Sequence, residues 1–127
     1  GPADVIAELD KVRPPYNVNV LTEAAVGFVL EHADVLEAQA QRIRATRDVL
    51  LAALKAMNGV QAFDTHANFV LVEFDRDVTD VFDGLKARGV LVKNMSKAHP
   101  MLSRCLRLTV GSESENAQLI QALQAVL

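Results

Sequence analysis

The sequence is poor in cysteine and contains no long apolar run. Cys105 is the only cysteine among 127 residues, which excludes an internal disulfide, and its place in a short apolar stretch favours an inert buried thiol. No segment is apolar over the length that a membrane span needs, and the first residues lack the charged and then apolar pattern of a secretory signal. We therefore expect a soluble, cytoplasmic protein with no membrane partner.

Basic blocks, glycine-rich loops and metal-binding clusters are also missing. Thirteen Lys and Arg residues stand against sixteen Asp and Glu residues, and because no basic block exists we expect no nucleic-acid partner. The six glycines stand singly, which excludes a glycine-rich phosphate loop. His32, His66 and His99 lie far apart in the sequence without a close partner, so we expect no bound metal.

The sequence does contain enough apolar residues, half of the total, for the core of one compact unit. Helical spacing predicts a short helix from about Ala3 to Val12, which Pro14 and Pro15 end. A second helix should be capped by Asn19, with an expected buried face of Leu21, Ala24, Ala25, Phe28 and Val29.

A long helix is predicted from Asp34 to about Met57, where strong helix formers continue without Pro or Gly. It would span roughly 36 Å, more than a domain of this size needs. Its apolar face is sparse in the first half, whereas Leu50, Leu51 and Leu54 form a regular stripe in the second. We expect only the second half to pack on the core.

The remaining residues change to a strand-like period. The predicted strands are residues 60–63, 69–74, 90–92 and the run around Leu106, Leu108 and Val110. Asp77 should cap one intervening helix, and Ser112 with Glu115 has the spacing of a capping box for the last one. The predicted fold class is a two-layer α/β (α+β) arrangement: N-terminal helices and a long connector helix, followed by a small sheet of three or four strands covered by helices.

Arg107 is the candidate binding residue that these elements position. It would stand on the polar face of the last strand, and a guanidinium held on a rigid strand suits bidentate binding of a carboxylate or phosphate. The alternative is a structural salt bridge to one of the sixteen acidic residues. Lys93 is a second candidate for anion binding.

No catalytic centre is evident. Ser96-Lys97 has the local pattern found around lysines that form Schiff bases with pyridoxal phosphate, but Lys97 lies in a polar loop without a desolvating pocket or a phosphate-binding turn nearby. We interpret Lys97 as a surface lysine. Cys105 has no paired histidine to activate it.

Four segments together resemble one enzyme family: Val12–Asn17, Ala67–Leu71, Gly89–Met95 and Cys105–Gly111. In this order they are similar to the C-terminal part of the histidinol-phosphate aminotransferases, which belong to the pyridoxal-phosphate enzymes with the aspartate aminotransferase fold. The resemblance covers essentially the whole sequence. It implies that these residues are part of a chain nearly three times as long.

The resemblance also implies a domain division and a site. Residues 1–33 would be the last helices of the large domain, and residues 34–127 the connector helix and the small C-terminal domain. Arg107 matches the arginine that binds the substrate carboxylate, and Lys93 falls where many members carry an arginine. The Schiff-base lysine and the other cofactor-binding residues would precede Gly1, so we expect no catalytic or cofactor-binding residue, and no bound cofactor, in these 127 residues.

The function implied by the resemblance is amino-group transfer between glutamate and imidazole-acetol phosphate, which yields histidinol phosphate in histidine biosynthesis. Arg107 suits other enzymes of the fold equally well, including another aminotransferase or a threonine-phosphate decarboxylase. A stand-alone binding module that reuses the small-domain fold is a third possibility. The first helices carry apolar residues that the family covers with the large domain and a second subunit, so we expect a homodimer.

Overall fold

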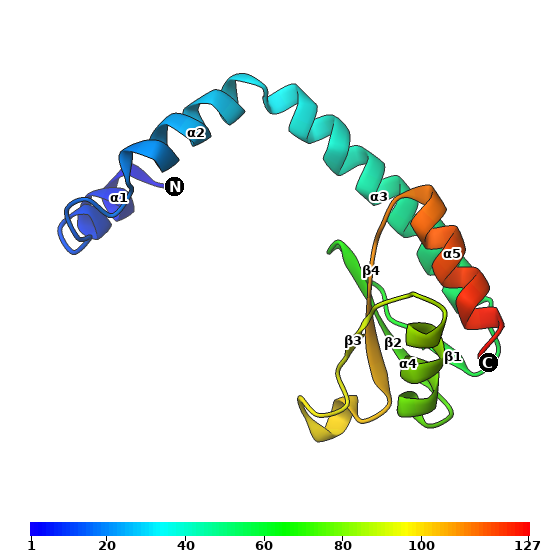
Figure 1. Ribbon diagram of the computed structural model, residues 1–127. Helices are drawn as coiled ribbons and strands as arrows, with labels where there is room; N and C mark the ends of the chain where they lie inside the picture. The colour runs from blue at the N-terminus through cyan, green and yellow to red at the C-terminus, as the bar shows by residue number, and fades with distance from the viewer. The chain divides into compact units, whose positions relative to one another are not determined.

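The structure is a computed structural model that describes residues 1–127. The chain divides into two compact units, residues 1–37 and residues 38–127, with the division inside helix α3, Ala33–Lys55. Figure 1 labels the helices and strands of both units. No helix is long and apolar enough to cross a membrane.

The first unit contains α1, Ala3–Asp10, and α2, Val20–Glu31. The Asn19 side chain accepts a hydrogen bond from the Thr22 amide at 2.8 Å, so the predicted cap of α2 is confirmed. Between the two helices, Tyr16 adopts a φ of 62°, in the left-handed region that non-glycine residues seldom occupy. The chain therefore makes a tight turn at Tyr16, between the two helices.

The prediction of a buried face on α2 is wrong for this chain. Neither α1 nor α2 contains a buried residue, and Leu21 and Phe28 are 82% and 64% exposed. The apolar residues do line one face of the helix at helical spacing, but no element of the first unit packs against that face. These side chains need a partner surface from outside the unit to be buried.

The second half of α3 belongs to the second unit and packs on its core, as predicted. Leu50 and Leu54 are almost fully buried, and Thr46 and Arg47 are the buried polar residues of this stretch. The Thr46 hydroxyl donates to the backbone carbonyls of Arg42 and Ile43, which satisfies the buried group within the helix.

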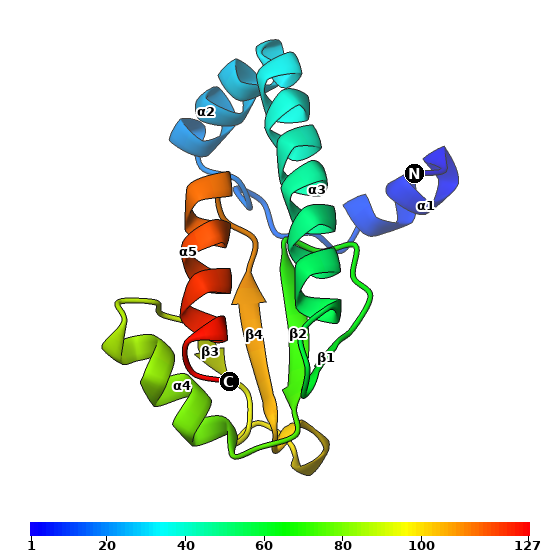
Figure 2. The ribbon, with the colours of Figure 1, turned by 90° about the vertical axis from the view of Figure 1, so that its right-hand side faces the viewer.

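The second unit is built on a four-stranded sheet in the order β1-β2-β4-β3. The strands are β1, Val60–Ala62, β2, Phe69–Phe74, β3, Lys93–Asn94, and β4, Cys105–Thr109, and every neighbouring pair is antiparallel. Two helices complete the unit: α4, Val78–Ala87, and α5, Glu113–Gln124. Figure 2 shows α4, α5 and the second half of α3 on one face of the sheet. The two-layer prediction is confirmed.

Alternation along the strands separates the two faces of the sheet. In β2 and β4, Val70, Val72, Phe74, Leu106 and Leu108 are buried and form the core beneath the helices together with Leu50, Leu54, Leu85 and Leu123. The other face carries the alternate side chains of the same strands and no α-helix of the second unit. We call it the open face, and it contains both candidate binding residues.

Both predicted helix caps of the second unit are present. The Asp77 side chain accepts from the Thr79 amide at 2.7 Å, and this contact lowers the pKa of Asp77. Ser112 and Glu115 form a capping box, in which the Ser112 amide and hydroxyl donate to the Glu115 carboxylate and the Glu115 amide donates back to the Ser112 hydroxyl. The capping box fixes the start of α5 directly after β4.

The strand predicted at residues 90–92 is wrong. Only Lys93–Asn94 pairs with β4, and Leu91 is 79% exposed. Residues 89–92 instead diverge from β4 and line a hollow of about 440 Å³ with the end of β4 and the start of α5, and the Val90 amide donates to the Leu85 carbonyl of α4. Because the Val90 amide is hydrogen-bonded to the preceding helix, it does not need a strand partner.

Candidate functional site

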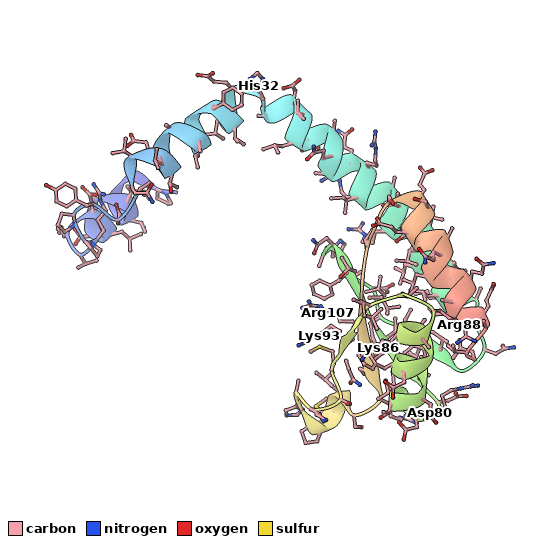
Figure 3. All side chains as sticks on the ribbon, in the orientation of Figure 1. His32, Asp80, Lys86, Arg88, Lys93 and Arg107 are labelled. Atoms are coloured by element: carbon pink, nitrogen blue, oxygen red, sulfur yellow. The ribbon has the colours of Figure 1, made fainter.

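Arg107 and Lys93 lie opposite each other on neighbouring strands of the open face. The register of β3 and β4 pairs Lys93 directly with Arg107. Both side chains are exposed, and Figure 3 shows both of them on the side of the sheet away from α4. Two cations directly opposite one another repel, so an anion placed between them gains from both. The strands therefore hold two positive charges that the protein does not neutralise.

The Arg107 guanidinium stacks on an aromatic ring and has no acidic partner. Its central carbon lies 5.1 Å from the centroid of the Phe69 ring, a cation–π distance. Arg107 makes no hydrogen bond and no ion pair, and Lys93 makes none either. The structural salt bridge considered for Arg107 is therefore absent, and the donors of its planar fork are available to a ligand.

One carboxylate lies near this site and is already paired. Glu73 is the only acidic residue in the four strands, and its side chain shares the open face with Arg107. The Arg104 guanidinium, just before β4, forms an ion pair with the Glu73 carboxylate at 2.6 Å. The one acidic side chain of the four strands is thus held by a different arginine.

Cys105 is a buried thiol, as predicted. It is 2% exposed, and its register partner across the sheet is Glu73. Burial raises the pKa of the Cys105 thiol and the Glu73 carboxylate raises it further, although the Arg104 guanidinium acts in the opposite direction. Cys105 therefore stays protonated at neutral pH and is a poor nucleophile.

The lysines of the chain do not fit the role of a cofactor-binding lysine. All five, including Lys93 and Lys97, are exposed, whereas a Schiff-base lysine needs a desolvated pocket. Lys97 lies in the turn before the short 3-10 helix Pro100–Leu102, and His99 caps that helix by accepting from the Met101 amide. No group of three or more His, Cys, Asp or Glu side chains is placed to hold a metal ion.

Comparison with known proteins identifies the family and the fold of this chain. The aminotransferase class I and II family matches residues 1–123. The chain belongs to this family. It is 58% identical over its whole length to a histidinol-phosphate aminotransferase of an Acidovorax species, of which it covers 34%. It is 55% identical, again over its whole length, to a histidinol-phosphate aminotransferase of Methylibium petroleiphilum, of which it covers 34%.

A solved structure agrees with the fold. The histidinol-phosphate aminotransferase of Clostridium acetobutylicum superimposes with a TM-score of 0.81 at 21% identity, over 97% of this chain and 37% of that one. At this identity the likeness shows the fold alone. The chain thus spans about a third of the length of the curated relatives it matches, and its similarity to them lies in their C-terminal part.

Sequence reasoning missed the partners that surround Arg107. Alternation alone places Phe69, Leu71 and Glu73 on one face of β2, and the printed sequence contained that signal. The register that brings Leu71 opposite Arg107, with Phe69 and Glu73 on its two diagonals, depends on the pairing of β2 with β4 across more than thirty residues. Single-sequence patterns do not encode that pairing.

Proposed function

We propose that this aminotransferase chain is the C-terminal part of a histidinol-phosphate aminotransferase, which transfers an amino group between glutamate and imidazole-acetol phosphate to give histidinol phosphate in histidine biosynthesis. The observation that carries the proposal is the 58% identity to a protein of that name over every residue of the chain. The site geometry supports it, because both substrates carry anions and the open face presents two cations without an internal partner.

In this proposal Arg107 binds and orients the substrate, and it takes no part in the covalent step. Its guanidinium, which stacks on Phe69 and has no carboxylate partner, donates two parallel hydrogen bonds to the substrate carboxylate. Lys93 adds a second positive charge at the register position opposite. Because a lysine lacks the planar fork of an arginine, its contact attracts an anion without fixing its orientation.

The reactive lysine and the cofactor site lie outside these 127 residues in this proposal. Pyridoxal phosphate, when bound to the intact enzyme, supplies the electron sink that amino-group transfer needs. No lysine of this chain has the desolvated surroundings that the cofactor requires, so this chain contributes substrate binding and not the covalent step. We expect the chain alone to be inactive.

The first unit has a separate role in the proposal. Residues 1–33 would complete the large domain and residues 34–127 would form the connector and the small domain. The unpacked apolar side chains of α2 support a homodimer, because the first unit does not bury them itself. We propose a cytoplasmic location, in keeping with the single buried cysteine.

The intact polypeptide that carries this chain tests the proposal. With pyridoxal phosphate present, it should form 2-oxoglutarate from glutamate when imidazole-acetol phosphate is the acceptor. The same preparation should not release carbon dioxide from threonine phosphate. Decarboxylation without amino-group transfer would replace the proposal by the decarboxylase of the same fold. If the 127 residues were the whole protein and bound no amino acid, the chain would be a non-catalytic module.

A further inference from the structure

We infer that Arg104 is a positioning residue: by holding the Glu73 carboxylate it keeps the Arg107 guanidinium open for the substrate carboxylate. This inference rests on the proposed role of Arg107. Three observations on the open face carry it, and they concern Glu73, Arg107 and Arg104 in turn.

The first observation is that Glu73 can reach Arg107. In the β2–β4 register Leu71 lies opposite Arg107, so Glu73 occupies one diagonal position and Phe69 the other. Diagonal neighbours on one face of an antiparallel pair have Cα atoms roughly 7–8 Å apart, within the span of a glutamate and an arginine side chain. Phe69 reaches the guanidinium across its own diagonal, at 5.1 Å.

The second observation is that the charges around Arg107 favour the binding of a carboxylate. It faces Lys93 across β3 and β4, and no acidic side chain relieves the repulsion between them. Glu73 is the only acidic residue in the strands and is only partly exposed. Left without another partner, Glu73 would be drawn to Arg107 and would occupy the donors that a substrate carboxylate needs.

The third observation is that Arg104 prevents this. Its guanidinium binds the Glu73 carboxylate at 2.6 Å, and the two side chains line a shallow pocket with Gln61 at the far end of the open face. An ion pair of this exposure adds little to the stability of a fold. Its consequence lies instead at the neighbouring arginine, since the pair keeps the only acidic side chain of the strands away from the Arg107 guanidinium.

Substitution of Arg104 in the intact polypeptide tests the inference. Arg104→Ala should raise the KM for glutamate roughly three- to tenfold and leave kcat nearly unchanged, because the released Glu73 competes with the ground state and the transition state alike. Arg88→Ala is the matched control. It removes one positive charge from α4, where Arg88 contacts only backbone carbonyls and therefore releases no carboxylate.

Two double variants separate competition by Glu73 from a general loss of positive charge. Glu73→Gln in the Arg104→Ala background should return KM to near the unmodified value. Glu73→Asp in the same background keeps the charge but shortens the side chain, so it should also recover most of the affinity. If Glu73→Gln rescues and Glu73→Asp does not, the effect is long-range charge and the inference is wrong.

The same measurements distinguish failure of the inference from failure of the proposed function. If Arg107→Ala leaves the KM for glutamate unchanged, Arg107 does not bind the carboxylate and the proposed role falls. If Arg107→Ala raises KM while Arg104→Ala behaves like Arg88→Ala, the proposed role stands and the inference about Arg104 is wrong. Thermal unfolding of each variant reports whether a change in KM reflects a folded protein.

Discussion

At the scale of single residues, the open face is organised by which charges are paired. Arg104 and Glu73 neutralise one another, whereas Arg107 and Lys93 stand opposite each other without an anion. Phe69 supports the Arg107 guanidinium through its ring without using any of the hydrogen-bond donors. The open face therefore presents a guanidinium that is held in place and whose hydrogen-bond donors no side chain of the protein uses. A carboxylate-binding site requires this feature.

Arg107→Ala in the intact enzyme should weaken glutamate binding by roughly 2 to 5 kcal/mol, because a charged ligand loses its partner in a partly desolvated site. Arg107→Lys should recover only part of the loss, since a lysine keeps the charge without the bidentate fork. Steady-state KM values for glutamate measure both effects. Equal KM values for the Lys and Ala variants would show that bidentate geometry is unimportant at this position.

At the scale of elements, sequence patterns predicted those whose signals are local. Caps at Asn19, Asp77 and Ser112 lie within three residues of the amides they satisfy, so spacing alone located three helix starts. The strand predicted at residues 90–92 is wrong because apolar residues alone do not determine a partner strand. Strand pairing is a property of the whole sheet. The candidate site followed the same rule: the sequence indicated Arg107 and Lys93, whereas the register placed Lys93 opposite Arg107 and Phe69 and Glu73 beside it.

The capping box of α5 should make the second unit sensitive to acid. Hydrogen bonds from Ser112, from its side chain first and its amide second, lower the pKa of Glu115 below its usual 4.5. Because the folded value is the lower one, this stabilisation is present above pH 4.5 and is lost as the pH falls through the folded pKa. Glu115→Gln should therefore reduce the difference in urea midpoint between pH 7 and pH 3.

Glu113→Gln is the control for that measurement. It makes the same charge change in the same helical turn, but Glu113 makes no hydrogen bond to Ser112. Its pH dependence should stay close to that of the unmodified chain. If the Glu113 and Glu115 variants lose equal amounts of acid sensitivity, the effect belongs to the helix dipole and not to the capping box.

The second half of α3 should be essential for the second unit. Leu54 is fully buried against the sheet, and Leu54→Ala should destabilise the unit by roughly 2 to 5 kcal/mol through lost burial and an unfilled cavity. Val49 lies on the same helix and is 72% exposed, so Val49→Ala should change the free energy of unfolding by less than about 0.5 kcal/mol. Urea denaturation followed by circular dichroism compares them, and similar changes in the two variants would mean that burial of Leu54 against the sheet does not stabilise the unit.

At the scale of the whole molecule, the two units differ in how they bury apolar residues. The second unit has a continuous core beneath its sheet, whereas the first buries none of its residues. Val20, Leu21 and Phe28 are 78%, 82% and 64% exposed, although a folded chain seldom leaves a contiguous apolar surface of more than a few hundred Å² uncovered. The first unit therefore has the surface of an interface without its partner.

We predict that the isolated 127-residue chain associates through residues 3–45, as a homodimer or a larger assembly, while the sheet after Val60 stays monomer-like. Light scattering over a concentration series should give a mass above that of the 13.8 kDa chain. Leu21→Glu together with Phe28→Glu should shift the mass toward the monomer, because two charges placed on the apolar face of α2 cannot be buried without cost. Leu91→Glu is the matched control, since Leu91 is equally exposed, at 79%, but belongs to the second unit. A monomer at high concentration would show that the chain does not self-associate, and dissociation by Leu91→Glu alone would assign the interface to a different surface.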